Sequence, residues 1–149
     1  MHAHPYLRLT LALVFSYITM YGVMFLNVDE PAHVHLSLTR CYMALLMVAP
    51  MAVLMVVLMH GMYRNKAMNR AILFGAAVVF VVALIALRTQ TPIGDQQYMK
   101  AMIPHHSSAI LTSKHARITD PEVRRLADSI IASQEREIGE MERLLRTAR

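Results

Sequence analysis

A long helical pattern is divided in two by the stretch Arg117-Ile118-Thr119-Asp120-Pro121-Glu122. Asp120 is a favourable N-cap residue, Pro121 suits the first helical position, and Glu122 places an acid in the first turn. We therefore predict one helix from Asp95 to about Arg117, a turn at Ile118-Thr119, and a second helix that begins at Asp120. The expected fold of this part of the chain is an αα-hairpin.

The second predicted helix carries a mostly apolar face, because its members recur at steps of three and four residues. The members are Val123, Ala127, Ile130, Gln134, Ile138, Met141 and Leu145. Two helices alone bury little apolar surface, so a domain this short needs a partner. We expect the hairpin to pair with a second copy into a four-helix bundle, or to dock on the membrane spans.

Three uncharged apolar runs precede the hairpin, at residues 9–26, 41–59 and 71–87. The 149-residue chain is 56% hydrophobic, and its mean hydropathy is +0.39. A bilayer core of about 30 Å is crossed by about 20 helical residues, and about 17 is the lower limit. We predict an all-α protein with a membrane domain of three transmembrane helices at 1–90, followed by the hairpin domain at 91–149.

The charge distribution predicts how the chain crosses the membrane. Residues 1–94 hold six Lys or Arg and two acidic residues, whereas residues 95–149 hold nine and eight. The surplus positive charge therefore lies beside the spans, which is typical of topology-setting charge and not of a nucleic-acid-binding face. The basic loop at 60–70 and the N-terminus are expected in the cytoplasm. The loop at 27–40 and the hairpin then lie outside, in the periplasm if the membrane is a bacterial inner membrane.

Methionine is frequent in the predicted spans, and the second span carries one at every fourth residue. These positions are Met43, Met47, Met51, Met55 and Met59. A thioether is a soft ligand suited to Cu(I), and it is also a flexible filler at helix contacts. Both interpretations stay open, and the first would make the spans a metal path that serves His33 and His35 of the outer loop.

A cluster of thioethers and imidazoles marks the first hairpin helix. Met99, Met102 and His106 are spaced i, i+3 and i+7 and share a face, and His105 borders Met102. With the turn centred near residue 119, antiparallel partners have numbers that sum to roughly 238–240. This register places Met102 opposite Glu137, and it places the two histidines opposite residues 132–134.

The second helix supplies further ligand types at i and i+4, namely Glu137 and Met141. The predicted metal ligands are Met99, Met102, His105, His106, Glu137 and Met141. Thioethers with imidazole suit Cu(I), and Ag(I) by the same softness. Structural Zn²⁺ prefers Cys, and the single cysteine, Cys41, lies in a predicted span. A di-iron site needs several inward carboxylates, and the first helix has no Glu.

A known family shares the motifs of this hairpin. Asp95-Gln-Gln-Tyr-Met-Lys-Ala-Met-Ile-Pro-His-His-Ser-Ser-Ala-Ile110 and the later Glu137-Ile-Gly-Glu-Met141 resemble the family called domain of unknown function 305. The resemblance covers about residues 95–145. It implies a ferritin-like helical arrangement and periplasmic copper or silver binding through the six residues named above. Thr112 and Leu144 depart from the pattern, since members often carry Met and an aromatic residue there. Fewer thioethers predict weaker binding or a different stoichiometry.

The sequence thus favours a membrane-anchored periplasmic protein that binds Cu(I) or Ag(I) for tolerance, sequestration or hand-off. We expect no enzyme activity, because no nucleophile elbow or oxyanion structure accompanies Ser107 and Ser108. Two alternatives stay open. One is a transport component that uses the membrane methionines, and the other is a metal-free helical module for dimerisation or signalling. The expected partners are a metal ion, the lipid bilayer and a second copy of the chain.

Overall fold

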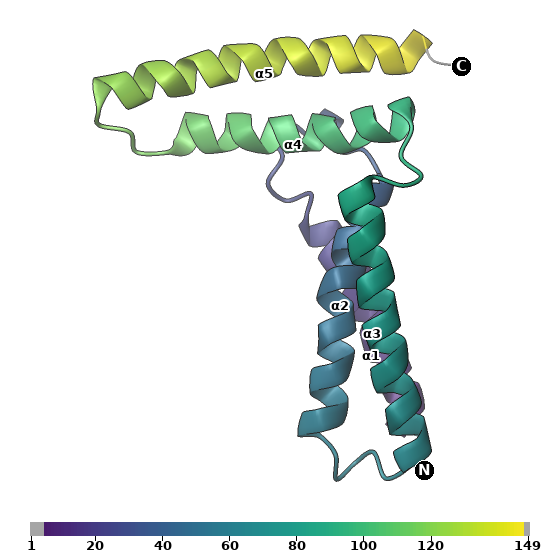
Figure 1. The fold of residues 1–149 in the computed structure, drawn as a ribbon. Coiled ribbons are helices and arrows are strands. Elements are labelled where there is room, and N and C mark those ends of the chain that lie inside the picture. The colour runs from purple at the N-terminus through teal and green to yellow at the C-terminus, as the bar shows by residue number, and fades with distance from the viewer. Residues whose placement is uncertain (1–4, 148–149) are drawn as a thin grey trace. The chain divides into compact units, whose positions relative to one another are not determined.

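The computed structural model describes residues 5–147, and within that range every regular element is a helix. His2 and His4, part of the polar N-terminal lead, lie outside the described residues. The elements are α1 (Pro5–Val23), the short 3₁₀ helix η1 (Pro31–His33), α2 (Leu38–Leu58), α3 (Lys66–Thr89), α4 (Asp95–His115) and α5 (Pro121–Thr147) (Figure 1). The prediction of an all-α protein is confirmed.

Helices α1, α2 and α3 are long and apolar enough to cross a membrane. They have 19, 21 and 24 residues, and they cover the three apolar runs with ends shifted by a few positions. Asn65 caps α3, since its side-chain oxygen accepts hydrogen bonds from the N–H groups of Ala67 and Met68 at 3.0 Å each. Pro50 lies inside α2, which continues past it to Leu58. Three helices suited to a membrane are therefore present, as predicted.

The chain forms two compact units, and unit 1 holds α1, most of α2, and α3. Its core joins Leu9 of α1, Val56 of α2 and Tyr63 of the following loop, and Ile72 of α3 packs against them. The Tyr6 hydroxyl donates to Asn69 Oδ1 at 2.9 Å in the same region. These contacts hold the three helices together at the end where the 59–65 loop lies.

The methionine row of α2 divides between the core and the surface of unit 1, since Met55 packs against the core while three others are exposed. Met43, Met47 and Met59 are 43%, 41% and 41% exposed in the described structure. Ala44, Ala49 and Ala52 are the side chains of α2 that are buried against the other helices, together with Val56. The small residues therefore make the helix contacts, and three of the five methionines lie on the outer surface of the unit.

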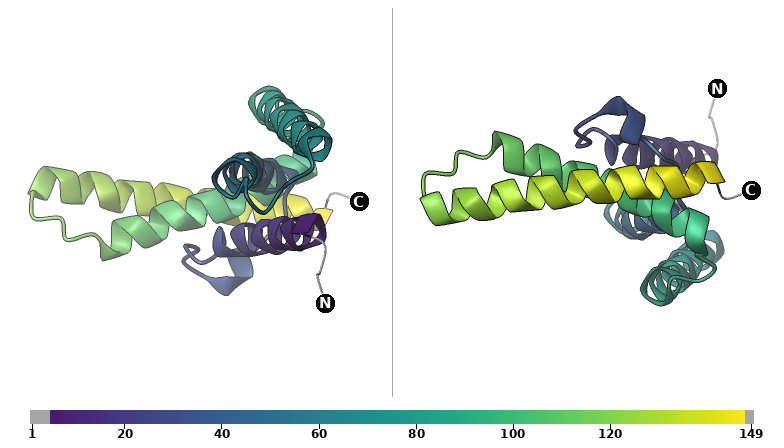
Figure 2. Two further views of the ribbon diagram at one scale, coloured as in Figure 1. Left: turned by 90° about the horizontal axis from the view of Figure 1, so that it is seen from below. Right: turned by 90° about the horizontal axis from the view of Figure 1, so that it is seen from above.

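Unit 2 joins the hairpin to a segment that precedes α2 in sequence. It contains residues 24–38, here named the connecting segment, and residues 93–149. Helices α4 and α5 run side by side in both views of Figure 2. Their seam buries Ile103, Ile110 and Ile138, while Met141 and Leu145 pack at its edge. The predicted αα-hairpin is present, and it packs on a segment of its own chain.

The turn between α4 and α5 confirms the predicted cap but shifts the predicted register. Asp120 Oδ1 accepts from the N–H groups of Glu122 at 2.7 Å and Val123 at 3.3 Å. His106 and Glu137 face each other across the hairpin, and their residue numbers sum to 243. The predicted register had partners whose numbers sum to roughly 238–240. The reason is that residues 116–120 are not helical, so the chain runs past the end of α4 before α5 begins (Figure 1).

This overhang explains why the start of α5 is exposed. Val123 and Leu126 are 49% and 60% exposed. The first buried side chain of α5 is Ala127, and its most buried side chain is Ile138.

The seam gives a first prediction. Ile138→Ala should lower the free energy of unfolding of unit 2 by about 3 kcal/mol, because it leaves a cavity against Ile103 and Ile110. The matched control Leu144→Ala, at an exposed position of the same helix, should change it by less than about 0.5 kcal/mol. Hydrogen exchange of the α4 and α5 amides in the full chain in detergent measures both. Equal effects of the two variants would contradict the assignment of the core.

Candidate metal site

His106 is the best-defined side chain of the predicted metal site. It lies on α4 and is 7% exposed. Its Nδ1 lies 3.0 Å from the carbonyl oxygen of Met102, one turn earlier in the same helix. Its Nε2 lies 2.6 Å from Glu137 Oε2 of α5. One ring nitrogen thus fixes the imidazole to its own helix while the other reaches the partner helix.

Glu137 is held at both oxygens. The Ser133 hydroxyl donates to Oε1 at 2.8 Å, and Oε2 meets His106. The hydrogen bond from Ser133 and the one from His106 together hold the pKa of Glu137 below its ordinary value. The carboxylate is therefore ionised near neutral pH, although its side chain is 52% exposed.

Each ring nitrogen of His106 has one oxygen partner. Nδ1 lies beside the Met102 carbonyl, and Nε2 lies beside the Glu137 carboxylate. The contact of Nδ1 with a backbone carbonyl holds the ring in place, and it directs Nε2 toward the other helix. That arrangement is typical of histidines that ligate metals.

The other predicted ligands differ in their exposure. Met99 is 7% exposed, whereas Met102 is half-buried. His105 is exposed, and its ring centre lies 6.2 Å from that of His106. Met141, half-buried, packs against the isoleucine seam of the hairpin. The structure therefore brings His106 and Glu137 into contact, and the backbone carbonyl of Met102 contacts His106, while His105 is at the surface.

Pro104 divides the α4 part of the site. Met99 and Met102 precede it, and His105 and His106 follow it. Proline has no N–H, so the Lys100 carbonyl loses its usual helical partner and the helix can bend there. The relative position of the thioethers and imidazoles on α4 therefore depends on the geometry at Pro104.

Ser107 faces the connecting segment and is completely buried. Its hydroxyl accepts from the Asp29 N–H at 2.7 Å and lies 2.9 Å from Nδ1 of His33. Ser107 therefore joins α4 to the connecting segment through two contacts, one with the backbone of Asp29 and one with the imidazole of His33.

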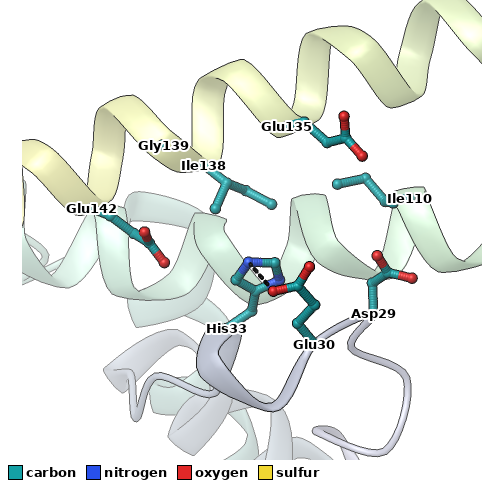
Figure 3. Close-up of a pocket in the computed structure, with 8 residues that line it drawn as sticks. All are labelled: Asp29, Glu30, His33, Ile110, Glu135, Ile138, Gly139 and Glu142. Atoms are coloured by element: carbon teal, nitrogen blue, oxygen red, sulfur yellow. Dashed lines mark ion pairs between the residues drawn. The ribbon is translucent and has the colours of Figure 1, made fainter.

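A cavity of about 260 Å³ lies between the connecting segment and the hairpin (Figure 3). It is lined by Asp29, Glu30, His33, Ile110, Glu135, Ile138, Gly139 and Glu142. Lys114 lies 2.7 Å from Asp29 and 3.6 Å from Glu135, and it joins the segment to both helices. The periodicity of the sequence does not predict this contact. The predicted topology gives the one indication, because it puts residues 27–40 and the hairpin on the same side of a membrane.

His35 lies at the edge of a neighbouring cavity with Glu142 and Arg146. Burial lowers the pKa of His35, and the charge of Glu142 opposes that effect. Its Nε2 is buried without a hydrogen-bond partner among the described residues. The neutral ring is therefore the form that this environment favours.

The described residues do not group three His, Cys, Asp or Glu side chains closely enough to hold a metal ion. His106 and Glu137 supply one nitrogen and one carboxylate. A metal bound at this pair would complete its coordination with the thioether sulfurs of neighbouring methionines. That donor set is the one that soft ions prefer.

The C-terminal part of the chain matches a known protein family. Residues 84–149 match the family described as "Domain of unknown function (DUF305)". The chain belongs to this family, a class that the hairpin motifs already indicated. It is also 36% identical over 138 residues to "Uncharacterized protein L153" of Acanthamoeba polyphaga mimivirus, and the alignment covers 91% of this chain and 89% of that protein. No solved structure matches.

The Glu137 contacts give a prediction about pH. Because the folded-state pKa of Glu137 is lowered, its contribution to stability is present above the unfolded-state pKa and is lost as the pH falls through the folded-state value. Wild type should therefore be more stable than Glu137→Gln at pH 7, and the difference should shrink toward pH 3. Hydrogen exchange of unit 2 at several pH values measures this difference. A difference that grows on acidification would show that the carboxylate is not held as described.

Proposed function

We propose that this chain is a membrane-anchored protein that binds a soft metal ion, Cu(I) or Ag(I), through its hairpin. The role is sequestration, tolerance or hand-off of the ion, without catalytic turnover. The observation that carries the proposal is the fixed geometry of His106. Its Nδ1 is bonded to the Met102 carbonyl, and its Nε2 is directed across the seam to Glu137.

The donor set supports a soft ion. Met102 and Met141 supply thioethers from the two helices, His106 supplies the imidazole, and Met99 lies one turn before Met102. Glu137 would either bind the metal ion through its carboxylate or keep its hydrogen bond with His106 and so orient the imidazole ring. His105, which is exposed, is an accessory ligand that reaches the ion from solvent. The resemblance to copper- and silver-binding members of the family points the same way.

The packing of the connecting segment supports the expected topology. It lies between α1 and α2, and the hairpin follows α3. Three spans put both on the same side of a membrane, and the two pack together in unit 2. The basic 60–70 loop then lies on the cytoplasmic side. We propose that the hairpin lies in the periplasm, carried by a bacterial inner membrane.

Metal binding gives the central prediction. Full-length protein in detergent should bind Cu(I) under anaerobic conditions in competition with a chelator. His106→Ala should weaken the affinity by about tenfold or more, since even outer-shell changes at metal sites cost that much. His115→Ala is the matched control, because His115 lies on the same helix and its Nδ1 has the same 3.0 Å contact to the carbonyl one turn earlier, that of Leu111.

Two results would contradict the proposal. One is wild-type protein that binds no Cu(I) above background. The other is an equal loss of affinity in His106→Ala and His115→Ala. The full chain is required for these measurements, because the connecting segment outside the 84–149 match packs directly on α4.

We also propose that two hairpins pair into a four-helix bundle, because the start of α5 is exposed. Val123 and Leu126 present apolar surface there without a partner in the described structure. A second copy would cover them, and it would double the number of ligands in one assembly. The methionines of α2 give less support to the alternative of a metal path, because three of the five face outward from unit 1.

Pairing gives its own prediction. Leu126→Glu should convert a dimer into a monomer, because the new carboxylate would be buried in an apolar interface without a partner. Ser129→Glu is the control, since it adds the same charge at another exposed position of α5. Light scattering of the full chain in detergent reports the mass. A monomeric wild type, or a dimer that survives Leu126→Glu, would contradict pairing through this surface.

A further inference from the structure

The connecting segment is bonded to α4 on both sides of Pro104. Before the proline, the Leu38 N–H donates to Gln97 Oε1 at 3.0 Å. After it, the Asp29 N–H donates to Ser107 Oγ at 2.7 Å, and Asn27 Nδ2 donates to Ser108 Oγ at 2.8 Å. Lys114 extends the attachment by a further two turns through its 2.7 Å contact with Asp29. The segment therefore spans the one position where α4 lacks an N–H.

The attachment on the far side of Pro104 is well buried. Ser107 is completely buried and His33 is 9% exposed, so their contact is shielded from water. The helix η1 (Pro31–His33) lies between the Asp29 and His33 contacts, which both meet Ser107. The chain then crosses Pro104 within five residues, from His33 to the contact of Leu38 with Gln97.

The side chains of the proposed metal site lie on both sides of the same proline. Met99 and Met102 precede it, and His106 follows it immediately before Ser107. Neighbouring residues of a helix point about 100° apart, so α5 receives His106 while the connecting segment receives Ser107. Any change in the bend at Pro104 would move the thioethers relative to the imidazole.

We propose that the connecting segment positions the two halves of the metal site by fixing the bend of α4 at Pro104. This inference rests on the proposed function for its consequence in metal binding, but the fixed bend itself does not. Gln97, Ser107 and His33 are positioning residues in this scheme, and none of them is a ligand of the soft ion. The segment lies outside the 84–149 match, so in this scheme the site depends on residues that precede α2 in the sequence.

The distance across the bend tests the inference without metal. Spin labels at Asp95→Cys and Thr112→Cys, in the full chain with Cys41→Ser, should lie about 26 Å apart along the helix axis. Gln97→Ala should broaden the distribution of distances, whereas Gln97→Glu should not, because its carboxylate still accepts from the Leu38 N–H. Ser107→Ala provides a second variant on the other side of the proline.

A second set of variants, made in a chain with Pro104→Ala, distinguishes an effect on the bend of α4 from a general loss of packing in unit 2. Pro104→Ala restores the missing N–H and the regular helix, so Gln97→Ala should no longer broaden the distances in that background. Broadening that persists with Pro104→Ala would overturn the inference, and so would a Gln97→Ala distribution identical to that of wild type. Hydrogen exchange of unit 2 confirms that each variant folds.

Metal affinity then separates this inference from the proposed function. With Pro104 present, Gln97→Ala should weaken Cu(I) binding by about tenfold, as outer-shell changes do, and Gln97→Glu should restore it. Unchanged affinity in a chain whose distances have broadened would overturn the positioning of the site. If wild type binds no Cu(I), the proposed function fails, and the distance measurements alone decide whether the segment fixes the bend.

Discussion

The apolar seam between α4 and α5 is the interaction on which unit 2 depends. Ile103, Ile110 and Ile138 hold the two helices in one register. That register brings His106 of one helix to Glu137 of the other at 2.6 Å. A shift of one turn would keep much of the seam apolar but would separate this polar pair. The contact between His106 and Glu137 therefore forms only in the register that the isoleucine packing determines, and the candidate site depends on that register.

The connecting segment is the second constraint on unit 2. It lies between α1 and α2 in the sequence, and it supplies backbone donors and a buried histidine to α4. The hairpin gains a third layer of contacts from its own chain, which lessens the need of a two-helix domain for an outside partner. Ser107 shows the result, since a polar side chain is completely buried but fully bonded.

Much of this arrangement could be predicted from the sequence. Hydrophobic run length identified the three long apolar helices, and Asp120 with Pro121 located the start of α5. The partnership of His106 with α5 was expected, but its register was not, because the path of residues 116–120 depends on backbone angles that no periodicity encodes. The packing of Ser107 against Asp29 and His33 joins residues more than 70 positions apart, and local patterns carry no information about such contacts.

The attachment of the connecting segment to α4 also bears on how this hairpin could evolve. A domain that folds by itself can be moved between proteins as a cassette. This hairpin buries Ser107 against a loop that lies between two other helices of the same chain. Transfer to a single-helix anchor or a secreted chain would leave that serine and the α4 surface around it without their cover. Changes in the loop and in α4 should therefore accumulate together, so that the connecting segment and the hairpin are inherited as one unit.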